Sequence, residues 1–327
     1  MESRIGGRSE NQDMPGFADS ELGVIVVVCD GMGGMQGGST ASSLAVKTII
    51  DDVIASSEDP IGTLRRAILH ANEVILETGD ANPSLKGMGT TVTAVLLNEQ
   101  KAYVAHVGDS RVYQLRGRRK IFRTFDDSAV FQFVRSGAIS EEQARVSANS
   151  NVILKALGVT DELDFDIDVL PYDKGDRFVL CTDGFWGNVP EPVFLNLITK
   201  RGPIDLVVER TAGKMEKAGI LEKGGGHDNL TAAVFDTKVN SKYRSKMEKR
   251  FKALSAVLAV LLLASIAANV MFLCKDKPQA NTESTEVKDV IDNCDSLQQD
   301  MSAKGESAAK KLVDLKKKIK DATSSLK

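Results

Sequence analysis

Signatures of several common site chemistries are missing from this chain of 327 residues. Its four cysteines, at positions 29, 181, 274 and 294, form no Cys-x-x-Cys pair, so the sequence supports neither a zinc site nor a disulfide framework. The net charge of −3 gives no basis for expecting nucleic acid as a partner. The first residues, Met1–Arg4, contain no apolar stretch, and we therefore expect no signal peptide.

A glycine-rich stretch at residues 31–38 fits neither of the two common nucleotide-binding patterns. It contains no Gly-Lys-Ser/Thr, and Gln36 occupies the position of the third glycine in a dinucleotide fingerprint. We therefore expect no nucleotide site in this stretch.

Four aspartates lie beside short apolar segments that are rich in β-branched residues, a pattern typical of buried strands. Burying a carboxylate at a strand end without a counter-charge is costly, so four of them favour a shared cation. Oxygen ligands without a thiolate or histidine cluster indicate Mg²⁺ or Mn²⁺ rather than zinc. The four are Asp30 after residues 24–29, Asp109 after 103–107, Asp183 after 178–182, and Asp228 before 230–235.

Residues 1–238 are predicted to form one α+β domain, in which strands and helices come in pairs. The pairs Pro60-Ile61 and Gly202-Pro203 are typical of helix starts. The polar stretch 126–150 separates two predicted strands and is the best candidate for a mobile flap. Helical periodicity occurs near residues 39–55, 61–78, 128–137, 140–149, 190–199 and 203–218.

The composition changes sharply after residue 240. Residues 239–252 form a juxtamembrane segment with six basic residues and one glutamate, and residues 253–274 contain no charge. At about 1.5 Å per residue, a helix over this span is long enough to cross a membrane, which we favour over a buried core helix. Because only two basic residues follow the span directly, we expect residues 1–238 in the cytoplasm and the tail outside.

The tail, residues 275–327, is polar and rich in lysine. Apolar residues in 308–326 are spaced alternately by four and three, which predicts an amphipathic helix or a short coiled coil. A solvated, weakly helical tail is an equal alternative. Cys294 and this spacing leave a homodimer open.

Six motifs occur in a defined order. They are Arg8-Ser9-Glu10-Asn11-Gln12-Asp13, Asp30-Gly31-Met32-Gly33-Gly34, Gly89-Thr90-Thr91, Gly108-Asp109-Ser110-Arg111, Asp183-Gly184-Phe185-Trp186 and Gly225-Gly226-His227-Asp228-Asn229-Leu230-Thr231. Their order and spacing resemble the type-2C (PPM) family of metal-dependent protein serine/threonine phosphatases, bacterial branch. The resemblance covers residues 1 to about 236 and implies an α-β-β-α sandwich of two antiparallel sheets flanked by helices.

The resemblance implies a metal-binding role for five residues. Asp30 would bridge two ions, and the carbonyl of Gly31 would bind one of them. Asp183 and Asp228 would bind the other ion. Asp109 resembles the family position that helps to bind a third, weaker ion.

Two further residues are expected to act on the substrate and on water. Arg8 would clamp the phosphate through a bidentate contact, and Asp13 would orient water from behind the metal ligands. Taken alone, Arg8 is equally well interpreted as a surface arginine. Asp13 and Asp109 could also be turn or cap residues.

The implied function is hydrolysis of phosphoserine and phosphothreonine on proteins by a water that bridges two Mn²⁺ or Mg²⁺ ions. The substrates would be those of a cognate kinase, and the catalytic domain would be anchored to the membrane. Two alternatives stay open. One is a phosphatase of a signalling regulator in an anti-sigma-type switch, and the other is a non-catalytic metal-binding module coupled to a sensing tail.

Overall fold

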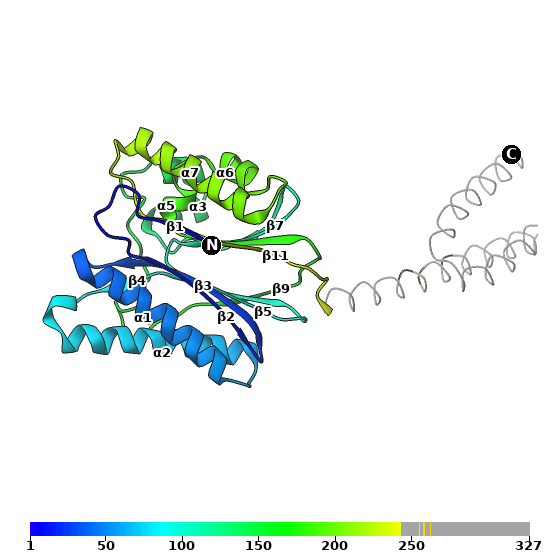
Figure 1. Cartoon of the computed structure of the whole chain (residues 1–327), viewed down its shortest axis with the longest axis horizontal. Coiled ribbons are helices and arrows are strands. Elements are labelled where there is room, and N and C mark those ends of the chain that lie inside the picture. Colours follow the sequence, from blue (N-terminus) through cyan, green and yellow to red (C-terminus); the bar gives the residue numbers. More distant parts are fainter. Residues whose placement is uncertain (243–254, 256–257, 259–261, 263–327) are drawn as a thin grey trace, which may run out of the picture. The chain divides into compact units, whose positions relative to one another are not determined.

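The computed structural model of the protein describes residues 1–242 together with Ser255, Leu258 and Leu262. Residues 1–242 belong to the first compact unit of the chain, Met1–Ala253. In them, two antiparallel sheets pack against each other between two layers of helices (Figure 1). The α-β-β-α sandwich expected from the sequence is therefore confirmed.

The first sheet has the strand order β2-β3-β5-β6-β9, and β4 pairs with the end of β3. Its strands are β2 (Asp13–Ser20), β3 (Gly23–Met32), β4 (Gly89–Thr90), β5 (Val92–Leu97), β6 (Ala102–Val107) and β9 (Ile167–Leu170). The second sheet has the order β1-β11-β10-β7-β8. Its strands are β1 (Glu2–Arg4), β7 (Arg111–Arg116), β8 (Arg119–Arg123), β10 (Asp176–Cys181) and β11 (Leu230–Asp236).

Two long helices, α1 (Gly34–Ala55) and α2 (Pro60–Ala81), cover the first sheet, and α6 (Glu191–Ile198) and α7 (Ile204–Lys223) cover the second (Figure 1). As predicted, Pro60 begins α2, where the Asp59 side chain accepts hydrogen bonds from the first free backbone N–H groups. Four shorter helices are η1 (Pro83–Leu85), α3 (Ala129–Arg135), α4 (Glu141–Arg145) and α5 (Asp183–Trp186).

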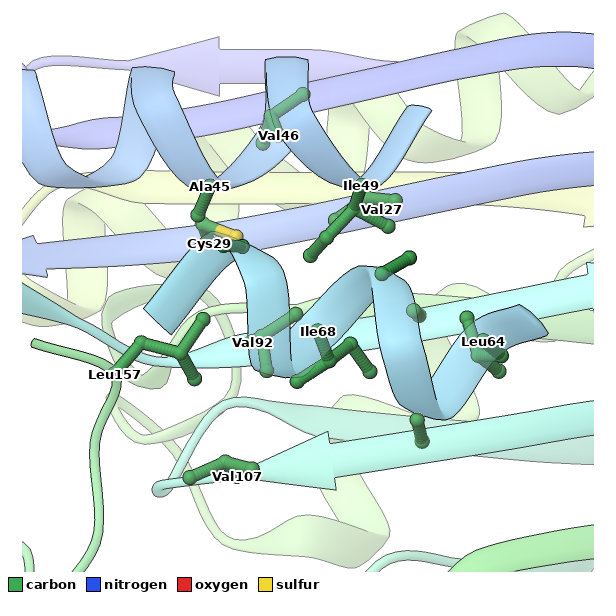
Figure 2. Packing of buried hydrophobic residues seen from close by; sticks show 14 of the residues in the cluster. Val27, Cys29, Ala45, Val46, Ile49, Leu64, Ile68, Val92, Val107 and Leu157 are labelled. Atoms are coloured by element: carbon green, nitrogen blue, oxygen red, sulfur yellow. The ribbon is translucent and has the colours of Figure 1, made fainter. Parts of the chain in front are cut away.

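Strand β3 shows why its sequence is apolar throughout. Successive side chains of a strand point to opposite faces. Val27 and Cys29 therefore pack under α1 and α2, beside Ile49 and Ile68 (Figure 2), whereas Val28 packs between the two sheets. Because both faces are covered, the strand holds its acidic end, Asp30-Gly31, on a rigid support at the edge of the core.

The segment expected to be a flap, residues 126–150, contains α3 and α4 and a small core of its own formed by Val130, Phe131 and Ala144. The helix predicted over 140–149 ends earlier, at Arg145. The mobility of the segment stays a prediction.

The expected membrane span, residues 253–274, lies outside the described residues except for Ser255, Leu258 and Leu262, and the expected tail helices lie wholly outside them. Within the described part of the chain, no helix has the length and apolar character needed to cross a membrane.

Candidate active site

The six motifs of the sequence meet in a cleft of about 450 Å³ at one edge of the sandwich. The cleft contains six of the seven predicted site residues, and the seventh, Asp13, lies buried next to it. The lining residues are Arg8, Ser9, Glu10, Gln12, Asp30, Gly31, Met32, Gly33, Thr91, Asp109, Asn151, Ile153, Asp183 and Asp228.

Asp30 is placed by the pairing of β3 with its neighbours. The backbone N–H of Asp30 donates to Thr91 Oγ1 at 3.0 Å, and the Asp30 carbonyl accepts from Thr91 N at 2.8 Å and from Thr90 Oγ1 at 2.8 Å. The Gly89-Thr90-Thr91 motif therefore fixes the backbone of Asp30 and thereby positions its carboxylate. Asp13 lies directly opposite Asp30 in the β2–β3 pair.

Gly31 is required by a close approach of backbone. A Cβ atom at this position would lie 2.0 Å from the carbonyl oxygen of Gly38 and 2.7 Å from that of Gln12. No larger residue fits there without moving the chain, and Gly31 is one of the residues that line the cleft.

Asp183 and Asp228 come from adjacent strands of the second sheet. Asp183 follows β10 and is the first residue of α5, and Asp228 precedes β11. A Cβ atom on Gly184 would lie 2.0 Å from the carbonyl oxygen of Asn229, so the two segments touch through their backbones. On the solvent side, Arg8 Nη2 donates to Asp228 Oδ2 at 2.6 Å, and the Arg8 side chain is 53% exposed.

The remaining two acidic residues, Asp109 and Asp13, accept hydrogen bonds from neighbouring side chains. Trp186 Nε1 donates to the carbonyl oxygen of Asp109 at 3.2 Å, and Thr182 Oγ1 donates to Asp13 Oδ2 at 2.9 Å. The other carboxylate oxygen of Asp13 is buried and has no hydrogen-bond partner among the described residues, and the same is true of Asp183 Oδ1.

Four carboxyl groups in or next to the cleft, those of Asp13, Asp30, Asp109 and Asp183, resist ionisation when no cation is present. Burial, together with nearby carboxylates, raises the pKa of Asp13 to about 7 and that of Asp183 to about 6. Burial and the same neighbours raise the pKa values of Asp30 and Asp109 well above the ordinary range.

A buried cation next to the cleft, Arg111, acts to lower the pKa of Asp109 but does not overcome burial and the nearby carboxylates, and it is paired with another carboxylate. Arg111 is 2% exposed, and its Nε and Nη2 atoms donate to Asp126 at 2.7 Å each. Its guanidinium also lies 3.2 Å from the centre of the Trp186 ring. Arg111 thus joins Trp186 to Asp126, the first residue of segment 126–150. It pairs with the Asp126 carboxylate through two hydrogen bonds and stacks on the Trp186 ring.

The donor set fits a divalent cation of the Mg²⁺ or Mn²⁺ type. The cleft offers carboxylates and a backbone carbonyl, and one carboxylate oxygen that lines it, Asp183 Oδ1, is buried without a hydrogen-bond partner among the described residues. In the part of the chain that the structure describes, no three carboxylate, histidine or cysteine side chains are grouped so that they could hold a metal ion by themselves. A Mg²⁺ or Mn²⁺ ion bound here would therefore take further ligands from water.

Eight lining residues were not among the predicted site residues. Six of them, Glu10 included, lie inside the first three motifs, which were the signal available for them, whereas Asn151 and Ile153 follow segment 126–150 and carry no motif. They reach the cleft because Ile153 forms a bridge with Ser128 and because Leu157 bridges to Thr90.

Comparison with known proteins identifies the family of the chain that carries this cleft. Residues 2–222 match the family described as Protein phosphatase 2C. The chain belongs to the protein phosphatase 2C family. The family expected from the six motifs is thus confirmed, as is the expectation that the protein is an enzyme.

Several bacterial proteins are similar to this type-2C phosphatase. It is 32% identical over 243 residues to the serine/threonine phosphatase stp of Listeria monocytogenes, covering 72% of this chain and 94% of that one. The crystal structure of the Mycobacterium tuberculosis serine/threonine phosphatase PstP/Ppp is 30% identical with a TM-score of 0.61, covering 72% and 97%. The catalytic domain of PstP in complex with two manganese ions is 30% identical with a TM-score of 0.59, covering 72% and 95%.

Proposed function

We propose that this type-2C phosphatase hydrolyses phosphoserine and phosphothreonine on proteins that a cognate kinase has phosphorylated. The proposal depends on one observation: four aspartates from both sheets meet in a cleft whose mouth carries the exposed Arg8. The names of the relatives, and the two manganese ions in the PstP complex, support it.

The residues of the cleft divide into those that would hold metal and those that would act on substrate and water. Asp30 and the Gly31 carbonyl would hold one Mn²⁺ or Mg²⁺ ion, and Asp30 with Asp183 and Asp228 would hold a second. Asp109 would help to hold a third, weaker ion. When bound, such ions lower the pKa of a water molecule and stabilise charge on the phosphoryl oxygens.

Arg8 and Asp13 have complementary tasks. The guanidinium of Arg8 is held at the cleft mouth by one of its Nη atoms, so its other N–H groups can donate to phosphate oxygens. Asp13 is buried next to the cleft, opposite Asp30 in the β2–β3 pair, and its Oδ1 atom has no hydrogen-bond partner among the described residues, so it would be available to orient a water molecule. No protein nucleophile is needed, because water attacks phosphorus.

Turnover of a phosphothreonine peptide and of p-nitrophenyl phosphate tests the proposal. We expect turnover to require added Mn²⁺ or Mg²⁺, to be lost in EDTA, and to leave no phosphorylated protein after an acid quench. Turnover that persists in EDTA, or a trapped covalent phosphoprotein, would contradict the mechanism. Mn²⁺ binding without any turnover would favour the non-catalytic module instead.

We also propose that residues 253–274 anchor the enzyme in a membrane, with residues 1–238 in the cytoplasm and residues 275–327 outside. The proposal is supported by the uncharged span and by the six basic residues that precede it. A reporter that is active only outside the cytoplasm should give signal when fused after Lys327 and none when fused after Asn240. A silent Lys327 fusion, with an intracellular reporter active at the same position, would refute this topology.

A further inference from the structure

A buried amide and a buried imidazole lie behind the two segments that carry Asp183 and Asp228. Asn188 follows α5 and is 1% exposed, and His227 directly precedes Asp228 and is 3% exposed. Neither side chain lines the cleft. Any effect of these two side chains on the cleft must therefore pass through the residues that they contact.

The amide of Asn188 secures the turn that presents Asp183. Its Nδ2 atom donates to the carbonyl oxygen of Gly184 at 2.7 Å and to that of Met215, on α7, at 3.4 Å. Because both partners are acceptors, they define which end of the amide is the nitrogen. The Oδ1 atom is left buried without a partner among the described residues.

His227 occupies the corresponding place behind Asp228. Its backbone carbonyl accepts from Gly7 N at 3.0 Å, and its two ring nitrogens are buried without partners in the described part of the chain. Helix α7 packs against the His227 side chain at Gly219. A Cβ atom on Gly219 would lie 2.7 Å from His227 Cβ, 2.8 Å from its Cγ, and 3.0 Å from Asn188 Nδ2.

Packing alone does not explain why an amide and an imidazole stand at these two positions. Buried polar atoms without partners cost free energy, and apolar side chains would fill the same space without that cost. The two side chains meet at one glycine, next to two carboxylates of like charge that must be held close together. Residues behind metal ligands commonly fix the orientation of those ligands.

We propose that Asn188 and His227 are positioning residues, seated by Gly219, that hold Asp183 and Asp228 at the separation required for metal binding. The inference rests on the proposed assignment of these aspartates as metal ligands. Asn188 and His227 would touch neither metal nor substrate. Substituting them should therefore weaken Mn²⁺ binding by more than the loss of folding stability alone would explain.

The sharpest test compares two alanine substitutions in α7. In Gly219→Ala the added methyl group displaces His227 or Asn188, and the Kd for Mn²⁺ should rise about tenfold or more. In Gly213→Ala the methyl group meets only the end of the flexible Arg4 side chain, at 3.6 Å, and the Kd should not change. Both substitutions raise helix propensity by the same amount, so helix stability does not distinguish them.

A second pair of variants decides the question should Gly219→Ala not fold. Asn188→Leu keeps the branching of the side chain but loses the amide, and Asn72→Leu, which makes the same change in size and polarity, is its control. Asn72 is also 1% exposed and also bridges backbone groups, donating to Thr160 O at 2.9 Å and accepting from Gly158 N at 2.7 Å, but it lies on α2. Both variants should unfold at lower urea in EDTA, whereas only Asn188→Leu should bind Mn²⁺ more weakly.

The measurements are calorimetric titration of the full chain with Mn²⁺ and urea unfolding in EDTA. An Mn²⁺ affinity equal to wild type in Gly219→Ala and Asn188→Leu would overturn the inference. Equal weakening in Asn72→Leu would also overturn it, because a general loss of stability would then be the cause. A wild-type chain that binds no Mn²⁺ would instead refute the metal assignment on which the inference rests.

Discussion

Two aspartates at opposite ends of β10 allow the electrostatics of the cleft to be tested with a matched pair of substitutions. Asp176, at the start of the strand, is fully buried and accepts from Arg116 Nε at 2.7 Å and from Gln114 Nε2 at 2.7 Å. Burial opposes its charge, but these hydrogen bonds prevail and lower its pKa. Asp183, after the end of the strand, has a raised pKa because of burial and the nearby Asp228.

The substitutions Asp183→Asn and Asp176→Asn should therefore change stability in opposite directions. The pKa of Asp183 rises from 3.8 to about 6, and each pKa unit corresponds to about 1.4 kcal/mol. In the metal-free protein above pH 7, Asp183→Asn should raise the free energy of unfolding by up to about 3 kcal/mol. Asp176→Asn should lower it by about 2 kcal/mol, because it breaks charged hydrogen bonds.

The sign of the pH dependence follows from the raised pKa. A carboxyl that binds its proton more tightly in the folded state makes the metal-free protein lose stability as pH rises from about 4 through about 6. The Asp183→Asn variant should not lose stability in this way, because its amide does not ionise. The stability difference between the variant and the wild type should therefore be small at pH 4 and largest above pH 7.

Urea unfolding of the full chain in EDTA, at several pH values, measures both effects. A second series with Mn²⁺ at about 100 times its Kd should stabilise the wild type by about 2.7 kcal/mol and Asp183→Asn by much less. The reasoning is refuted if metal-free Asp183→Asn is less stable than the wild type at pH 8 with a difference that does not depend on pH.

Three further substitutions test other parts of the site. Asp30→Asn should abolish phosphopeptide turnover without loss of stability in EDTA, and turnover within about tenfold of wild type would exclude a bridging role. Arg8→Ala should raise KM for a phosphopeptide more than it lowers kcat, because the guanidinium binds ground-state phosphate; steady-state kinetics showing a fall in kcat at constant KM would contradict this. Arg111→Met leaves Asp126 buried without its partner and should cost about 3–5 kcal/mol in urea unfolding. A cost below about 1 kcal/mol would show that this pair does not support the cleft.

The sequence alone determined the strands, the long helices and the identity of the acidic residues, because their signals are local. An apolar run such as Val24–Cys29 predicts a strand buried on both faces, and the glycine after Asp30 marks where the backbone must pass closely. The order of the six motifs added the family and the sandwich, which were confirmed. The membrane span and the topology stay predictions, since they concern residues outside the described ones.

The contacts between these elements were decided only by the tertiary structure, because they join residues far apart in the chain. No local pattern brings Ile153 to the same cleft as Asp30, pairs Arg111 with Asp126 at 2.7 Å, or buries Asp13 next to that cleft rather than in its lining. Helix α5 has four residues, too few for a periodic signal, so its start at Asp183 was not predicted. Asn188 and His227 meet only because α7 packs across both at Gly219. Register and packing over long sequence separations, which no sequence period records, determine the spacing of the carboxylates.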